Sequence, residues 1–207
     1  MLLSRPGKNS IEDIVDKNSV KELIEFERFC RDNALWDEMK KCFAKESTVS
    51  ISWYQGSGEG FVEESSKMKS YAPHKICDTL VWVNKDKAVS ITMGAIHIRN
   101  EIDGNLVELQ SDVKFLYKTQ KIDDIWYIIS MDAIYEKDII LPVYQDGDVK
   151  ISKEDIKDYR PSYASLSYML STDGYKINQE LPGIDRPEMV DSLYKDADKW
   201  LLDNSRN

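Results

Sequence analysis

The feature that most constrains the fold is a series of strand patterns joined by short polar turns between residues 75 and 135. Apolar and polar residues alternate over 88–99 and 106–119, which is the period of a strand with one buried face. Turn residues such as those at 103–105 separate consecutive strands. The pattern predicts a strongly curved antiparallel sheet built as a continuous meander.

Helical patterns come before and after this sheet. A capping-box pattern begins at Ser19 and predicts a helix that runs to about Asn33. Helices followed by a sheet predict an α+β domain. The expected organisation is a flexible N-terminal lead-in over 1–17, an α+β cone domain over 18–142 and a helical C-terminal extension over 143–207.

Composition excludes several classes of function. The chain has 28 Lys+Arg against 37 Asp+Glu, a net charge of −9, which argues against a nucleic-acid partner. It lacks an apolar run long enough to span a membrane and lacks a signal-peptide pattern at its start. Three scattered cysteines and two histidines form no metal-ligand cluster. We therefore expect a cytoplasmic protein that needs no metal or organic cofactor.

The two histidines, His74 and His97, are the first candidates for proton transfer, because imidazole is the side chain that titrates near neutrality. Period-two arithmetic places His97 on a mostly apolar strand face, and Ser111 on an apolar face of the next strand. Two interpretations are open. The pair is either a structural hydrogen bond or part of a pocket lined by a few polar groups.

Glu27 is a second anomaly, because it falls within the apolar face of the first helix. Its side chain either packs at the margin of that face with its head in water, or lines an internal cavity as a carboxylate. The sequence leaves both alternatives open.

Three loosely defined motifs occur in a specific order: Asp-x-x-x-Trp-Asp at 32–37, His-x-Ile-x-x-Thr at 74–79 and Ile-Asp-x-x-Trp at 122–126. This order resembles the SnoaL-like branch of the nuclear-transport-factor-2-like (NTF2-like) superfamily, and within it scytalone dehydratases and bile acid 7α-dehydratases. The resemblance covers roughly residues 15–142. It implies a cone-shaped curved antiparallel sheet wrapped by N-terminal helices around a deep pocket.

The resemblance also implies catalytic roles. Asp32, His74 and His97 match the acid–base positions of the dehydratases, and Ser111 matches a pocket serine. His74 would act as base and then as acid, oriented by Ser111, while Asp32 would pair with His97. The three catalytic residues must then converge on one cavity that a substrate can reach.

The carbonyl-binding residues of the dehydratases are not reproduced in this chain. Arg31 stands where scytalone dehydratases have a tyrosine, and Val113 stands at the position of a pocket asparagine. Trp53 or Tyr54 could replace a second tyrosine, and Glu27 is a further pocket candidate. The acid–base set therefore resembles the family, whereas the substrate-binding set departs from it.

The resulting hypothesis is a dehydratase that removes water β to a carbonyl or similar group of a small apolar, aromatic or polycyclic hydroxy-carbonyl substrate. One alternative is an isomerase or cyclase that uses the same pocket, and another is a non-catalytic binding protein. The mass of one water, lost only in dehydration, separates the first two. The resemblance also favours a homodimer or homotrimer.

Overall fold

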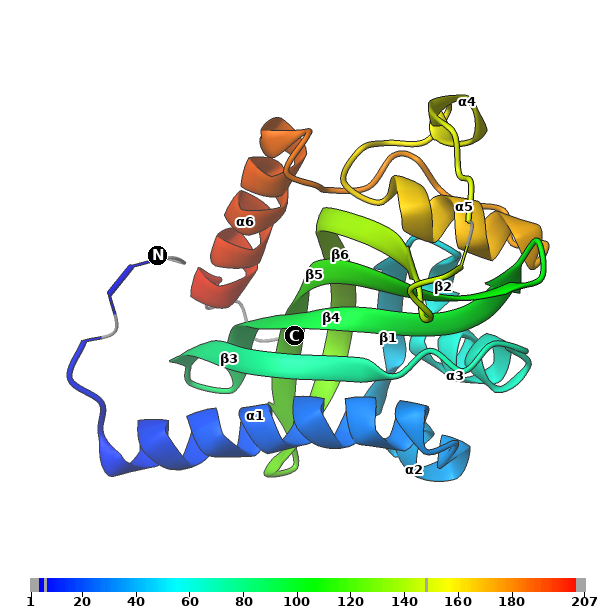
Figure 1. Ribbon diagram of the computed structural model, residues 1–207. Helices are drawn as coiled ribbons and strands as arrows, with labels where there is room; N and C mark the ends of the chain where they lie inside the picture. Colours follow the sequence, from blue (N-terminus) through cyan, green and yellow to red (C-terminus); the bar gives the residue numbers. More distant parts are fainter. Residues whose placement is uncertain (1–3, 6, 148, 204–207) are drawn as a thin grey trace.

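The computed structural model describes residues 4, 5, 7–147 and 149–203. One curved, unclosed sheet is flanked by helices, which confirms the expected α+β class (Figure 1). In chain order the elements are α1 (Ile11–Asp32), α2 (Trp36–Lys41), β1 (Phe43–Ile51), β2 (Tyr54–Ser57), α3 (Gly58–Ser66), β3 (His74–Asn84), β4 (Lys87–Ile102), β5 (Asn105–Ile122), β6 (Ile125–Pro142), α4 (Lys153–Ile156), α5 (Ala164–Thr172) and α6 (Pro187–Leu202).

Six strands of the described chain pair in the order β2-β1-β6-β5-β4-β3. The strands from β3 to β6 are antiparallel neighbours, as the meander pattern predicts. β1 instead runs parallel to β6, so the expectation of a purely antiparallel sheet is wrong for this pair. A parallel pair needs a long crossover, and here everything from β2 to β5 lies between the two strands.

Bulges and tight turns contribute to the curvature of the sheet. Register shifts occur between Ile76 and Asp78 in the β3–β4 pair and between Asp112 and Val113 in the β5–β6 pair. An extra residue in one strand bends it and increases its twist. The turn at 103–104 has φ angles of 50° and 75°, as a two-residue type I′ hairpin requires.

Helices cover both faces of the sheet (Figure 1). The inner face, which carries Phe115, packs in one hydrophobic cluster with Ile24 of α1 and Leu170 of α5. The outer face, which carries Leu116, packs in a second cluster with Leu201 of α6. Successive residues of a strand therefore belong to different clusters.

The first helix begins earlier than the sequence analysis expects. Ser10 is its N-cap and forms a capping box with Asp13, so 11–17 is helical and the capping box predicted at Ser19 is wrong. The Ser19 hydroxyl instead donates to the Val15 carbonyl within the helix. Asp16 anchors these turns by accepting a hydrogen bond from the Trp126 indole and by pairing with Lys121.

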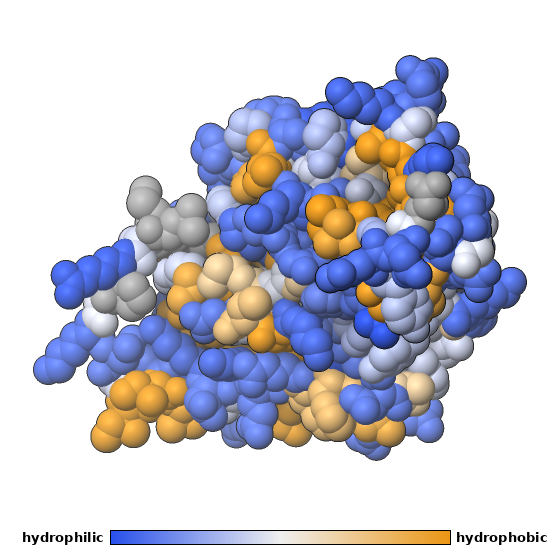
Figure 2. Space-filling view, viewed as in Figure 1, coloured by the Kyte–Doolittle hydropathy of each residue, from blue (hydrophilic) through white to orange (hydrophobic). Residues whose placement is uncertain are grey.

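Apolar side chains are exposed on the same first turns of α1. Figure 2 shows a hydrophobic patch there, one of several on this face, and Ile11 is 83% exposed. Although α1 has 22 residues, no helix in the described ranges combines this length with the apolar character needed to cross a membrane.

The chain after β6 returns to the sheet. The Tyr135 N–H donates to the Pro182 carbonyl, and the Tyr135 carbonyl accepts from the Ile184 N–H, each at 3.0 Å. Asp185, which precedes α6, binds the Arg160 guanidinium at 2.5 and 3.0 Å. These contacts hold the segment with α5 against the inner face.

Candidate active site

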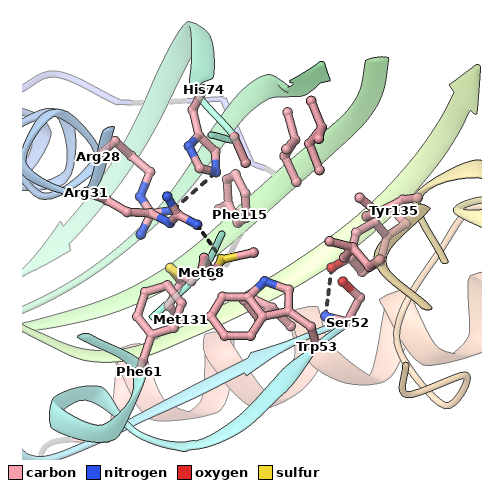
Figure 3. Close-up of a pocket in the computed structure, with 16 residues that line it drawn as sticks. Arg28, Arg31, Ser52, Trp53, Phe61, Met68, His74, Phe115, Met131 and Tyr135 are labelled. Atoms are coloured by element: carbon pink, nitrogen blue, oxygen red, sulfur yellow. Dashed lines mark hydrogen bonds between the residues drawn. The ribbon is translucent and has the colours of Figure 1, made fainter. Parts of the chain in front are cut away.

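A small cavity lies between the last turns of α1, the inner face of the sheet and α5 (Figure 3). Its walls are mostly apolar and aromatic, and they include Trp53, Phe61 and Phe115. Its free volume is about 30 Å³, which is room for roughly two water molecules. The charged side chains in the wall are the guanidinium groups of Arg28 and Arg31, beside the His74 imidazole.

His74 and Asp32 form the central hydrogen-bonded pair of this site. Asp32 ends α1, and His74 begins β3. One carboxylate oxygen of Asp32 lies 2.8 Å from His74 Nδ1, and the other accepts from the His74 backbone N–H at 2.7 Å. The carboxylate therefore fixes both the backbone and the ring, and it assigns the proton of the neutral imidazole to Nδ1.

The environment keeps His74 neutral at physiological pH. Burial lowers the pKa of His74 to about 4; the Asp32 hydrogen bond opposes this shift, and the charges of Arg28 and Arg31 add to it. Burial raises the pKa of Asp32, but its bonds to His74 outweigh this and hold it below its ordinary value. The pair is thus an Asp carboxylate beside a neutral imidazole with an unprotonated Nε2.

Arg28 faces that Nε2 atom. Its Nη1 lies 3.4 Å from His74 Nε2, and its guanidinium also packs over the rings of Phe61 and Phe115. The same guanidinium forms a two-point ion pair with Glu27, in which Nε and Oε2 are 2.5 Å apart. Both residues are buried, so Glu27 balances the Arg28 charge beside the imidazole.

The structure supports neither of the two interpretations of Glu27. Its side chain is fully buried, so its carboxylate does not reach water. It is nevertheless absent from the cavity wall, because Arg28 lies between the two. The expectation that Glu27 lines the pocket is wrong, and its contact with the site runs through Arg28.

The position of His97 contradicts the predicted catalytic set. Ile96 and Ile98 line the cavity, whereas His97 between them points to the outer face, as strand alternation requires. Its Nδ1 lies 3.1 Å from Glu108 Oε1, and its side chain is 25% exposed. The expected pairing of Asp32 with His97 is therefore wrong, and the three residues do not converge on one cavity.

Ser111 is also displaced from its predicted role. It pairs with Ile96, which pairs with His74, so two strand spacings of ~4.8 Å each separate Ser111 from His74. Its hydroxyl is fully buried and has no hydrogen-bond partner in the described chain. Asp32 and Arg28, not Ser111, face the two ring nitrogens of His74.

Of the other predicted binding residues, Trp53 lines the cavity, as expected. Tyr54 does not, because its hydroxyl donates to the Ser57 carbonyl at 2.9 Å and its ring packs on Phe61. Val113 is fully buried in the inner hydrophobic cluster, away from the cavity wall. The expectations for Tyr54 and Val113 are therefore wrong.

The two arginines of the wall are not among the site residues predicted from the sequence. A signal was present, because residues 27, 28, 31 and 32 are two anions and two cations at i, i+3 and i, i+4 spacing. At 100° per residue they share one side of α1 with Val20 and Ile24, both fully buried. Charged residues on the buried side of a helix need partners within the protein, and this predicts a polar site there.

Comparisons with known proteins place this geometry in context. No protein-family model matches the chain. Two curated relatives come from Fusarium vanettenii. A PEP2-like protein is 26% identical over 91% of this chain and 86% of its own length. Pea pathogenicity protein 2 is 25% identical over 90% of this chain and 86% of its own length.

Solved structures give the class of fold. A putative scytalone dehydratase from Novosphingobium aromaticivorans matches with a TM-score of 0.51 and 12% identity over 67% of this chain and 92% of its own. A hexachlorocyclohexane dehydrochlorinase, LinA type 2, matches with a TM-score of 0.54 and 10% identity over 69% and 98%. The chain has the NTF2-like fold, which confirms the resemblance drawn from the sequence motifs at the level of architecture.

Proposed function

We propose that the protein is a cofactor-independent small-molecule lyase in which His74 Nε2 is the general base. The observation that carries this proposal is the Asp32–His74 pair. It presents a neutral imidazole, held by a carboxylate at 2.8 Å, to an apolar cavity. The unprotonated Nε2 can take a proton from carbon once a substrate displaces the Arg28 N–H that faces it. The two structural relatives named above are both described as enzymes of elimination reactions, which agrees with this proposal.

The proposed reaction is the loss of water from a β-hydroxy carbonyl compound. Nε2 takes the α-proton, and the electrons of that C–H bond pass into an enolate. The bond to the β-hydroxyl then breaks while Nε2–H returns the proton to the leaving oxygen, which gives an unsaturated carbonyl and water. The Arg28 guanidinium, 3.4 Å from Nε2, disfavours the imidazolium, so it opposes the first transfer and promotes the second.

The cavity walls favour an aromatic or apolar substrate. Trp53, Phe61 and Phe115 supply flat apolar surface, which suits a ring more than a polar chain. The free volume of about 30 Å³ is smaller than such a ring, so binding requires wall side chains to move outward. Met68 lies in the wall and is flexible, and it is suited to that movement.

An isomerase is the second candidate, and the position of His97 favours it. One histidine lines the cavity in the described chain, so one group must both take and return the proton. Isomerisation needs only this shuttle between two carbons and no leaving group. The two reactions differ in whether the product has lost the mass of one water.

The experiment is a turnover assay in D₂O with a panel of aromatic β-hydroxy ketones, read by mass spectrometry. A lyase gives products that have lost one water, and an isomerase gives products that have lost no water and carry deuterium. His74→Gln should slow either reaction by ~10²–10⁴-fold. His97→Gln is the matched control, because it removes an imidazole from the outer face and should leave the rate unchanged. Equal rates for the two variants would reject the assignment.

A further inference from the structure

The charged side chains at the end of α1 are not equally matched. Glu27 and Arg28 neutralise each other in a two-point ion pair. Both carboxylate oxygens of Asp32 are occupied by His74. Arg31 therefore has no carboxylate of its own in this group of four, although its guanidinium faces the same cavity (Figure 3).

Arg31 is nearly as buried as its neighbours. The residue is 8% exposed, and no ion pair joins it to a carboxylate in the part of the chain that the structure describes. Burial and the nearby Arg28 charge lower its pKa to about 10, so it stays a cation at neutral pH. Burying a guanidinium without an anionic partner lowers the stability of the fold. Its five N–H donors also need several acceptors.

The acceptor that Arg31 does have is a weak one. Its Nη2 donates to the sulfur of Met68 at 3.0 Å. A thioether is a poor acceptor for a charged donor, and a methionine side chain adopts several conformations at low cost. Met68 lies in the loop between α3 and β3, two residues after the end of α3. Its sulfur therefore occupies the position from which an anion could bind Arg31.

We propose that Arg31 binds the carboxylate of an aromatic or alicyclic acid, and that the Met68 side chain moves aside when the acid enters. Guanidinium binds carboxylate through two parallel hydrogen bonds. The Arg28 guanidinium in the same wall is already committed to Glu27 and faces His74, so Arg31 is the one left to bind a ligand in this way. The aromatic wall then holds the ring of the acid. The inference concerns the ligand class of the pocket proposed above for a lyase, and it does not require that catalysis occur.

This arrangement also restricts which carbon faces the base. Arg31 and Arg28 are one helical turn apart on α1, and Arg28 faces His74 Nε2. A carboxylate on Arg31 therefore lies on the wall that holds the imidazole, and carbons near the carboxylate face Nε2. A neutral compound of the same shape lacks this anchor and binds without a fixed direction.

The test uses trans-cinnamate and its neutral amide, trans-cinnamamide, with binding measured by calorimetry and thermal shift at pH 7. Wild type should bind the acid at least ~10-fold more tightly than the amide, because a charge-assisted pair is lost in the amide. At ten times its Kd the acid should raise Tm by about 3–6 °C. Equal affinity for the two compounds would overturn the proposal.

Variants locate the anion. Arg31→Met should abolish the preference for the acid, and Arg31→Lys, which keeps the charge without the fork, should retain only part of it. If Arg31→Met does not fold, Arg31→Lys is the test. An Arg31→Lys variant that keeps the full wild-type preference for the acid over the amide would overturn the proposal. Arg99→Met removes a 60%-exposed arginine of the outer face and should change nothing. Met68→Ala should tighten acid binding by up to ~10-fold, because no side chain has to be displaced.

His74→Gln separates this inference from the proposed reaction. The variant should bind cinnamate as wild type does, since Arg31 is intact. Acid binding by Arg31 without any turnover would reject the lyase and leave the ligand class standing. Turnover of neutral hydroxy ketones without acid binding would do the reverse.

Discussion

His74 and His97 lie on neighbouring strands in almost the same row of the sheet, yet their environments are opposite. His74 pairs with Ile96, the residue before His97, and the His97 N–H donates to the Pro73 carbonyl. Each imidazole is bound through Nδ1 to a carboxylate, at 2.8 Å for Asp32 and 3.1 Å for Glu108. The His74 side chain is 5% exposed and faces the cavity, whereas that of His97 is 25% exposed and faces outward.

The difference shows that a histidine–carboxylate pair does not by itself define a site. The inner pair is desolvated and lies beside two guanidinium groups, so its protonation state is fixed. The outer pair shares its carboxylate with Arg99 and lies near solvent, where charges are screened. The two pairs differ because their histidines point to opposite faces of the sheet, and a shift of one residue in a strand is enough to change the face.

The largest expected effect comes from breaking each carboxylate–histidine pair in turn. Asp32→Asn removes the acceptor that fixes the tautomer of His74, and it should lower turnover by ~10²–10⁴-fold. Glu108→Gln makes the same change at the outer pair and should leave turnover within about twofold. The assay is the D₂O reaction proposed above. A similar loss in both variants would show that the two faces are not functionally distinct.

Breaking the ion pair next to each histidine should also have different effects on the stability of the protein. Glu27→Ala leaves Arg28 buried without a partner and should lower the free energy of unfolding by about 3–5 kcal/mol. Glu108→Ala breaks a partly exposed pair with Arg99 and should cost about 0–1 kcal/mol. Urea denaturation of the two variants measures the difference. Equal losses would contradict the burial contrast.

The pH dependence of stability gives a third comparison. The pKa of His74 is about 4 in the folded protein and 6.5 as an ordinary value, so the unfolded chain binds this proton first. His74 therefore contributes stability that is fully present above about pH 6.5 and is lost as pH falls toward 4, by on the order of 3 kcal/mol. His74→Gln should remove this part of the slope, and His97→Gln should retain it. NMR titration measures the pKa of His74 directly, and an ordinary value there would contradict this prediction.

The smallest effect is expected at Ser111. Ser111→Ala removes a buried hydroxyl that has no partner, so stability should change by less than about 1 kcal/mol in either direction. Turnover should not change, since Asp32 and Arg28 face the ring nitrogens of His74. A loss of turnover above tenfold would restore the role that the sequence motif predicted for Ser111.

The strands of the meander could be predicted because each has a two-residue period and a polar turn at its end. The parallel pairing of β1 with β6 could not, because it joins segments about eighty residues apart and leaves no local pattern. The start of α1 was missed because two capping-box patterns compete, at Ser10 and at Ser19. The buried contacts of Asp16 with Trp126 and Lys121 favour the earlier start.

The site was predictable only in part. The motif order identified Asp32 and His74, which the structure brings together. Strand periodicity showed which residues share a face with His97, but both faces of β4 are apolar and both are covered. The face with Val89 and Ile91 packs under α6, and only the helical extension after residue 142 makes that face a second core. Periodicity alone cannot tell such a face from a pocket.

The parallel strand pair has a consequence for the order of folding. Contacts within the meander are local, whereas β1 can dock only after β6 exists, and closing that long loop is slow. Trp53 and Ser52 follow β1, and the Ser52 N–H donates to the Tyr135 hydroxyl of β6 across the cavity wall. We therefore expect this cavity to form last during folding. During folding, the β3–β6 meander would form before the chain has a cavity that can bind a ligand.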